Sequence, residues 1–198
     1  MVFPWFPVFD SMLSQQNMAY EATNHQRRSI RLQGYDYTQA GAYFVTLCAH
    51  NRERLFGEIV DGTVRLNNLG EIVAEQWLQT GVLRQEITLD TWVVMPNHFH
   101  GIVMIVDADL RGGRGTARRA PTVERFGQPV PGSLSTIVRS FKSAATKRIN
   151  QARSTPGAPV WQRNYWEHVV RNETDLHELR QYICSNPLSW VLDKLFAG

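Results

Sequence analysis

Two histidines flank a single aromatic residue, as His98-Phe99-His100, inside the apolar run 92–105. Such a run is typical of a buried strand, in which successive side chains point to opposite faces. His98 and His100 therefore share one face, and Phe99 points to the other. Two imidazoles held side by side can bind one divalent metal ion. The alternative is a pair of core histidines whose ring nitrogens are satisfied by hydrogen bonds.

A tyrosine and an asparagine stand four residues apart near the end of the chain. Tyr182 and Asn186 lie beside the apolar stripe of a predicted helix, one turn from each other. A phenol has a pKa near 10, so it needs a nearby base or metal ion to act as a nucleophile. The amide oxygen of Asn186 is a possible third ligand for a hard cation. The alternative for Tyr182 is simple packing at the border of a buried face.

The expected cofactor is Mg²⁺ or Mn²⁺. Imidazole nitrogen favours Mn²⁺ or another borderline ion over Mg²⁺, whereas phosphate oxygens suit both ions. His98 and His100 therefore point to an ion that accepts nitrogen and oxygen ligands together.

Basic residues are concentrated in one stretch of the sequence. Between residues 111 and 153 there are ten Lys and Arg and a single acid, Glu124, in a chain whose net charge is only +3. A basic block on a mildly acidic body predicts a polyanionic partner, most commonly nucleic acid. The alternative is a solvated loop without a partner.

Hydrophobic periodicity and turn residues divide the chain into strands and helices. In order, these are a strand at 42–48, a hairpin at 55–66 around Asp61-Gly62, a helix capped by Asn68 that ends near Gly81, strands at 87–95 and 98–106, a helix capped by Ser133 or Ser135, a strand within 160–170, and a helix capped by Asn172 or Thr174 that ends near Pro187. Apart from the hairpin, this order predicts a ferredoxin-like α+β fold, an antiparallel sheet with helices on one face. Because strand 98–106 is apolar on both faces, we expect the last helix to cover the other face.

Two segments fall outside these elements. Residues 1–26 are predicted to be an N-terminal extension, and residues 107–132, rich in Gly, Pro and Arg, a basic insert in a single domain of residues 27–198. No apolar run is long enough to span a bilayer, so no membrane partner is expected. The two cysteines form no CxxC pair or disulfide framework, which favours a cytoplasmic protein.

Four stretches resemble a known family. The segment Met95–His100 resembles the metal motif of HUH-type single-tyrosine transposases. Three more, Arg139–Lys142, Trp161–His168 and Tyr182–Pro187, resemble the branch called REP-associated tyrosine transposases. The resemblance extends from about residue 27 to about residue 190.

This resemblance implies a ferredoxin-like nuclease domain that acts on single-stranded DNA next to a hairpin. It implies that His98 and His100 bind the metal, that Asn186 completes the metal site, and that Tyr182 is the nucleophile. The implied reaction is a transesterification through a 5′-phosphotyrosine, which a free 3′-hydroxyl can reverse. Many relatives are dimers, so a homodimer is possible, and Tyr182 is able to serve either its own chain or a partner.

Basic and aromatic residues supply the expected DNA contacts. The basic residues expected to bind DNA are Arg111, Arg114, Arg118, Arg119, Arg139, Lys142, Lys147 and Arg163. Trp161, Tyr165 and Trp166 either stack on bases or pack in the core. Two other functions stay open: a non-catalytic module that binds single-stranded nucleic acid, and a hydrolytic metal phosphodiesterase.

Overall fold

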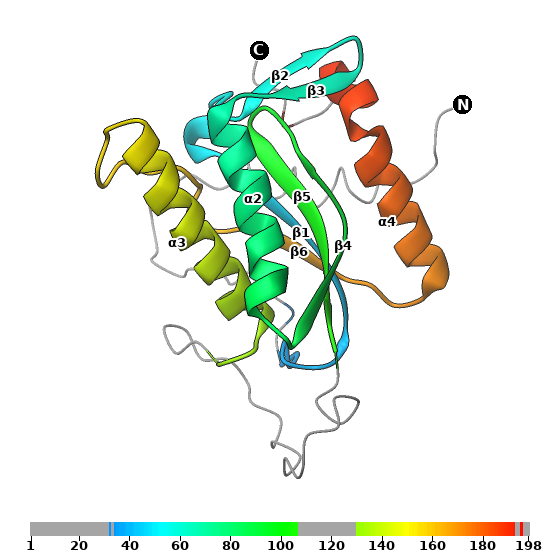
Figure 1. Cartoon of the computed structure of the whole chain (residues 1–198). Helices are drawn as coiled ribbons and strands as arrows, with labels where there is room; N and C mark the ends of the chain where they lie inside the picture. Colours follow the sequence, from blue (N-terminus) through cyan, green and yellow to red (C-terminus); the bar gives the residue numbers. More distant parts are fainter. Residues whose placement is uncertain (1–31, 33, 107–129, 193–194, 196–198) are drawn as a thin grey trace, which may run out of the picture. The chain divides into compact units, whose positions relative to one another are not determined.

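Four strands form an antiparallel sheet in the order β4-β5-β1-β6 (Figure 1). Their bounds are β1 Gly41–Cys48, β4 Ile87–Val94, β5 His98–Ile105 and β6 Trp166–Val169. The central strands β1 and β5 pair along their whole length, from Gly41 opposite Ile105 to Cys48 opposite His98. A βαββαβ chain with this strand order is a ferredoxin-like sandwich, which confirms the predicted α+β fold class.

The computed structural model describes residues 32, 34–106, 130–192 and 195. The predicted extension at 1–26 and most of the predicted insert at 107–132 lie outside these residues. Within the described part, no helix combines the length and the apolar character needed to cross a membrane.

The predicted hairpin forms a separate two-stranded sheet. Strands β2 (Gly57–Val60) and β3 (Thr63–Leu66) pair antiparallel. Asp61 and Gly62 connect them with φ values of 52° and 71°. A two-residue turn with both φ values positive matches the right-handed twist of the flanking strands, so the Asp-Gly signal was correct.

The first long helix, α2 (Asn68–Leu83), begins one residue earlier than predicted. Asn67, not Asn68, is the N-cap: its side-chain oxygen accepts hydrogen bonds from the backbone N–H groups of Leu69 and Gly70, at 2.9 and 3.0 Å. The helix also continues past Gly81. A Cβ there would lie 2.9 Å from Leu89, so this glycine permits close packing on the sheet instead of ending the helix.

The two later helices resolve the alternatives left by the sequence. Helix α3 (Leu134–Ala152) is capped by Ser133, and α4 (Glu173–Ser185) is capped by Asn172, which accepts from the backbone N–H of Asp175 at 2.9 Å. Short 3₁₀ helices lie at η1 (His50–Arg52) and at η3 (Asn186–Leu192), directly after α4.

The predicted strand within 160–170 is shorter than expected. Only Trp166–Val169 forms a strand, and Trp161 makes an isolated bridge with Ala49. Directly before β6, the ammonium group of Lys142 donates to the backbone carbonyls of Gln162, Arg163 and Asn164. These carbonyls are engaged by a side chain, so the segment does not extend the strand.

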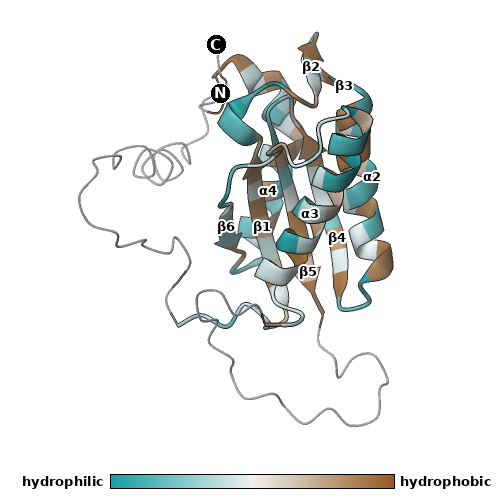
Figure 2. Cartoon of the chain, turned by 90° about the vertical axis from the view of Figure 1, so that its left-hand side faces the viewer, coloured by the Kyte–Doolittle hydropathy of each residue, from teal (hydrophilic) through white to brown (hydrophobic). Residues whose placement is uncertain are grey.

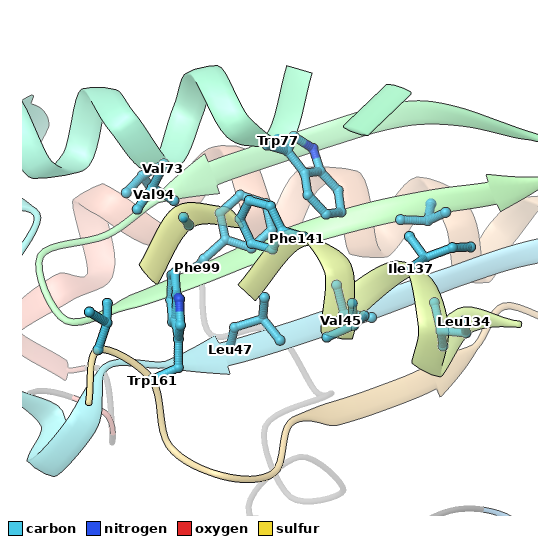
Figure 3. Close-up of a cluster of buried hydrophobic side chains, with 14 of the residues drawn as sticks. Val45, Leu47, Val73, Trp77, Val94, Phe99, Leu134, Ile137, Phe141 and Trp161 are labelled. Atoms are coloured by element: carbon cyan, nitrogen blue, oxygen red, sulfur yellow. The ribbon is translucent and has the colours of Figure 1, made fainter. Parts of the chain in front are cut away.

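Helices cover both faces of the sheet. Helices α2 and α3 lie side by side on one face, and α4 lies on the other (Figures 1 and 2). Under α2 and α3, the ring of Phe99 lies 4.7 Å from that of Trp77 and 5.6 Å from that of Phe141, between ring centroids (Figure 3). Because Phe99 points into this core, its neighbours His98 and His100 point toward α4.

Candidate metal centre and nucleophile

The two histidines of β5 lie side by side in a buried position. Their ring centroids are 4.5 Å apart, with the planes inclined by 68°. The exposed fraction is 0% for His98 and 1% for His100. The alternation of the strand therefore places both imidazoles on the α4 face, as the sequence predicted.

A different polar side chain holds Nδ1 of each ring. The Nδ1 atom of His98 lies 2.8 Å from Oδ1 of Asn97, in the β4–β5 turn. The Nδ1 atom of His100 lies 2.8 Å from Oγ1 of Thr46, opposite it on β1. Metal-binding histidines are commonly oriented through hydrogen bonds on the ring nitrogen that does not bind the metal. This arrangement makes the two Nε2 atoms the candidate ligands.

The surroundings favour neutral imidazole at His100. Burial, and then the neighbouring imidazole of His98, hold the pKa of His100 well below its usual value of 6.5. The ring of Phe44 stacks on His100, with centroids 5.3 Å apart and planes inclined by 25°. A neutral ring has the lone pair that a metal ligand needs.

Helix α4 brings the phenol of Tyr182 to this pair. The Tyr182 hydroxyl lies 3.4 Å from Nε2 of His100, and the two ring centroids are 5.3 Å apart. Phe44 also contacts the phenol edge-on, at 6.1 Å between centroids. Tyr182 as a whole residue is half-buried.

One ion pair and one further side-chain contact link α4 to the sheet. Arg180 binds the carboxylate of Asp90 with two hydrogen bonds, and its Nε lies 2.9 Å from Oδ1. Asp90 lies where the register of β4 shifts, and such irregularities re-aim side chains. At the start of the helix, Asp175 pairs with His168 of β6 at 2.9 Å. These pairs tie α4 to both edge strands, at points before Tyr182 in the helix.

Asn186 and Trp190 follow Tyr182 in the chain. Asn186 is 3% exposed at the end of α4, one turn beyond Tyr182. The ring of Trp190, in η3, lies 5.9 Å from that of His98 between centroids. Helix η3 therefore contributes Trp190 beside His98, as α4 contributes Tyr182 beside His100.

The chemistry of these groups fits Mn²⁺ or Mg²⁺. Two imidazoles and an amide oxygen would offer nitrogen and oxygen ligands, a set that suits Mn²⁺ best and accommodates Mg²⁺ beside phosphate oxygens. Among the residues that the structure describes, no three or more His, Cys, Asp and Glu gather as a metal site. A metal at His98 and His100 would therefore need further ligands of another kind, such as Asn186, water or phosphate.

The residues predicted to bind DNA have different environments. Arg139, Lys147 and Arg163 are exposed. Lys142 is half-buried, and its Nζ donates to three backbone carbonyls, the nearest being that of Gln162 at 2.6 Å. Burial lowers the pKa of Lys142 to about 8. The other four, Arg111, Arg114, Arg118 and Arg119, lie outside the described residues.

The aromatic residues in and before β6 were expected either to stack on bases or to pack in the core. Trp161 is 7% exposed and packs in the core, with its ring 5.0 Å from that of Phe56 between centroids. Tyr165 and Trp166 are half-buried, and Trp166 contacts Phe44 edge-on. Core packing thus accounts for Trp161.

Sequence reasoning missed four residues of the site: Phe44, Thr46, Asn97 and Trp190. Asn97 had a signal, because it directly precedes His98 in a predicted turn. Thr46 and Phe44 become neighbours of the histidines only through the β1–β5 register. Nothing local in the sequence indicates that Trp190 returns to His98.

Comparisons with known proteins give the same fold and a family relationship. This chain is similar to the solved structure of a REP-associated tyrosine transposase bound to a REP hairpin. The match covers 87% of this chain and 77% of the transposase chain, with 20% sequence identity and a TM-score of 0.50. This likeness shows that the two proteins share a fold. An uncharacterized protein of Haemophilus influenzae is 35% identical over 177 residues, which cover 89% of this chain and 97% of that protein. This chain belongs to the same family as that protein. No family model matches the sequence.

Proposed function

We propose that this protein is a metal-dependent transposase that nicks and rejoins single-stranded DNA through a covalent intermediate on Tyr182. The observation that carries the proposal is the 3.4 Å distance between the Tyr182 hydroxyl and Nε2 of His100. A phenol nucleophile must lie close to the base or metal ion that activates it, and His100 is a proposed ligand of that metal ion. The shared fold with a REP-associated tyrosine transposase supports the same reaction class.

The proposed step is a transesterification at phosphorus. The phenol oxygen of Tyr182 attacks the phosphate and gives up its proton to solvent. The bond between phosphorus and the 3′ oxygen breaks, and that oxygen takes up a proton to become a 3′-hydroxyl. The 5′-phosphate of the downstream DNA segment stays attached to Tyr182. A 3′-hydroxyl of another strand reverses the step, so the phosphodiester is conserved without an external energy source.

His98, His100 and Asn186 are the proposed metal ligands, for Mg²⁺ or Mn²⁺. When bound, the ion would polarise the phosphate and stabilise the charge that develops on its oxygens. Thr46 and Asn97 contact the two imidazoles at Nδ1, the ring nitrogen that is not proposed to bind the metal. Phe44 supports His100 and Tyr182 together, since it contacts both rings.

The proposed partner is single-stranded DNA with a hairpin. The transposase that shares the fold was solved with a REP hairpin bound. Arg139, Lys147 and Arg163 expose basic side chains that are suited to phosphate contacts. Lys142 is proposed to act indirectly, because its ammonium group holds the loop that carries Arg163.

The test is incubation of the protein with labelled single-stranded hairpin DNA and MnCl₂, followed by denaturing electrophoresis. We expect a covalent protein–DNA adduct from the native chain and none from Tyr182→Phe. Tyr35→Phe is the matched control, because it also removes one phenol oxygen from a half-buried tyrosine. It should form the adduct at the native rate.

Two outcomes would overturn the proposal. Tight DNA binding without an adduct would indicate a non-catalytic binding module. Cleavage without an adduct, unchanged in Tyr182→Phe, would indicate a hydrolytic phosphodiesterase.

A further inference from the structure

We infer that Asn97 is a positioning residue whose side-chain oxygen sets the tautomer of His98, so that Nε2, the nitrogen proposed as metal ligand, carries the lone pair. The tautomer itself does not depend on the DNA chemistry. Its consequence for metal binding rests on the proposed function.

Asn97 occupies an unusually enclosed turn. It lies between β4 and β5 and is 0% exposed, although most turn residues face solvent. Its carbonyl accepts a hydrogen bond from the N–H of Ala49 at 2.8 Å, and the carbonyl of the preceding Pro96 accepts from the N–H of Phe56 at 2.9 Å. Within the turn, the N–H of Met95 donates to the carbonyl of His98 at 2.8 Å. The backbone that carries the Asn97 amide is therefore held from three sides.

The orientation of the Asn97 amide follows from its partners. Its nitrogen, Nδ2, donates to the backbone carbonyls of Arg52, at 3.3 Å, and of Leu195. Carbonyl oxygens only accept hydrogen bonds, so the NH₂ group must be the end that faces them. If the amide were rotated by 180°, its oxygen would face the carbonyl oxygens of Arg52 and Leu195, and no hydrogen bond could form between them. Oδ1 must therefore face His98.

The amide orientation dictates the state of the imidazole. Oδ1 can only accept, so Nδ1 of His98, at 2.8 Å, must carry the hydrogen. In a neutral ring with hydrogen on Nδ1, the lone pair is on Nε2. This is the form of the neutral ring that a metal ion at Nε2 requires, and the contact with Asn97 selects it without a bound metal.

His100 lacks this constraint. Its Nδ1 pairs with the hydroxyl of Thr46, which can either donate or accept. Both tautomers of His100 are therefore compatible with its partner. Of the two histidines, only His98 has its Nδ1 paired with an atom, Oδ1 of Asn97, that can accept a hydrogen bond but cannot donate one.

The decisive experiment reads the tautomer directly. Long-range ¹H–¹⁵N correlation spectra of metal-free protein labelled at histidine, at pH 7.5, distinguish hydrogen on Nδ1 from hydrogen on Nε2. The His98 signals are assigned by their loss in His98→Gln. We expect hydrogen on Nδ1 in the native chain. Hydrogen on Nε2 would overturn the inference, whether or not any variant folds and whether or not the protein cleaves DNA.

Two variants separate tautomer control from support of the turn. Asn97→Asp keeps an accepting oxygen but loses both Nδ2 donations, whereas Asn97→Ala loses all three contacts. We expect Asn97→Asp to keep hydrogen on Nδ1 of His98, and Asn97→Ala to populate the other tautomer. An unchanged tautomer in Asn97→Ala would overturn the inference, because the amide oxygen would then not determine it.

Metal titration tests the consequence. With MnCl₂ alone and calorimetric detection, we expect Asn97→Ala to bind about 10- to 100-fold more weakly than the native chain, as is usual when a partner of a metal-binding histidine is removed. Asn97→Asp should stay closer to the native value. Equal weakening in both variants would assign Asn97 to turn support only. If the native chain binds DNA but forms no adduct, the proposed function fails while the tautomer result stands.

Discussion

The hydroxyl of Tyr182 and Nε2 of His100 are 3.4 Å apart, although 82 positions separate the two residues in the sequence. The contact lies within one chain, so the proposed nucleophile is next to one proposed metal ligand, His100, of its own chain. Tyr182 is carried by α4 and His100 by β5, and the contact therefore depends on how the helix lies on the sheet. The ion pair between Arg180 and Asp90 is one polar link that fixes this placement.

We expect Arg180→Met to weaken the docking of α4. Loss of this two-bond ion pair should measurably lower the free energy of unfolding. Adduct formation should slow as well, because Tyr182 would be less firmly held over His100. Urea unfolding and a time course of the adduct are the measurements. Arg148→Met is the control for stability, since it breaks a more exposed ion pair with Glu75 and should change the unfolding free energy by less than about 0.5 kcal/mol.

The contribution of Asp90 should depend on pH. The hydrogen bonds from Arg180 are the main reason that the pKa of Asp90 falls from 3.8 to about 2. A carboxyl group with a lowered pKa in the folded state stabilises the protein above its unfolded pKa, and this stabilisation is lost as pH falls toward the folded pKa. The stability difference between the native chain and Asp90→Asn should be constant from pH 5 to 7 and should shrink between about pH 4 and pH 2. Urea unfolding at several pH values measures it, and a difference that does not change with pH would contradict the expectation.

Lys142→Met should destabilise the protein more than Lys147→Met. Both lysines are on α3, but Lys142 donates to the carbonyls of Gln162, Arg163 and Asn164, whereas Lys147 is exposed. Removal of an ammonium donor from one partly buried and two exposed hydrogen bonds should cost about 1–3 kcal/mol, against less than about 0.5 kcal/mol at Lys147. Thermal and urea unfolding of the two variants provide the comparison. Equal effects would mean that the ammonium–carbonyl bonds contribute nothing to stability.

Thr46→Val should weaken metal binding at nearly constant side-chain volume. Valine lacks the hydroxyl that lies 2.8 Å from Nδ1 of His100, so the ring loses the contact that orients it. We expect the affinity for Mn²⁺ to fall about 10-fold or more, measured by calorimetry. Thr46→Ser keeps the hydroxyl and should restore most of the affinity. If valine and serine behave alike, the hydroxyl does not orient His100.

Local patterns in the sequence determined much of the fold. Alternation along β5 predicted that His98 and His100 share a face, because side-chain direction in a strand repeats every two residues. Helical spacing predicted that Tyr182 and Asn186 are neighbours, and the Asp61-Gly62 pair predicted its hairpin turn. The N-cap of α2 is Asn67, where the sequence predicted Asn68, because the two asparagines are adjacent and either side chain is able to cap a helix.

The tertiary structure decided which of these local features meet. The β1–β5 register puts Thr46 opposite His100, and the packing of α4 puts the Tyr182 hydroxyl next to His100. Tertiary packing also places the ammonium group of Lys142 against the backbone before β6 and buries Trp161 in the core. The physical reason is range: periodicity fixes direction within one element, whereas the distance between elements depends on strand register and packing, to which residues far apart in the sequence contribute together.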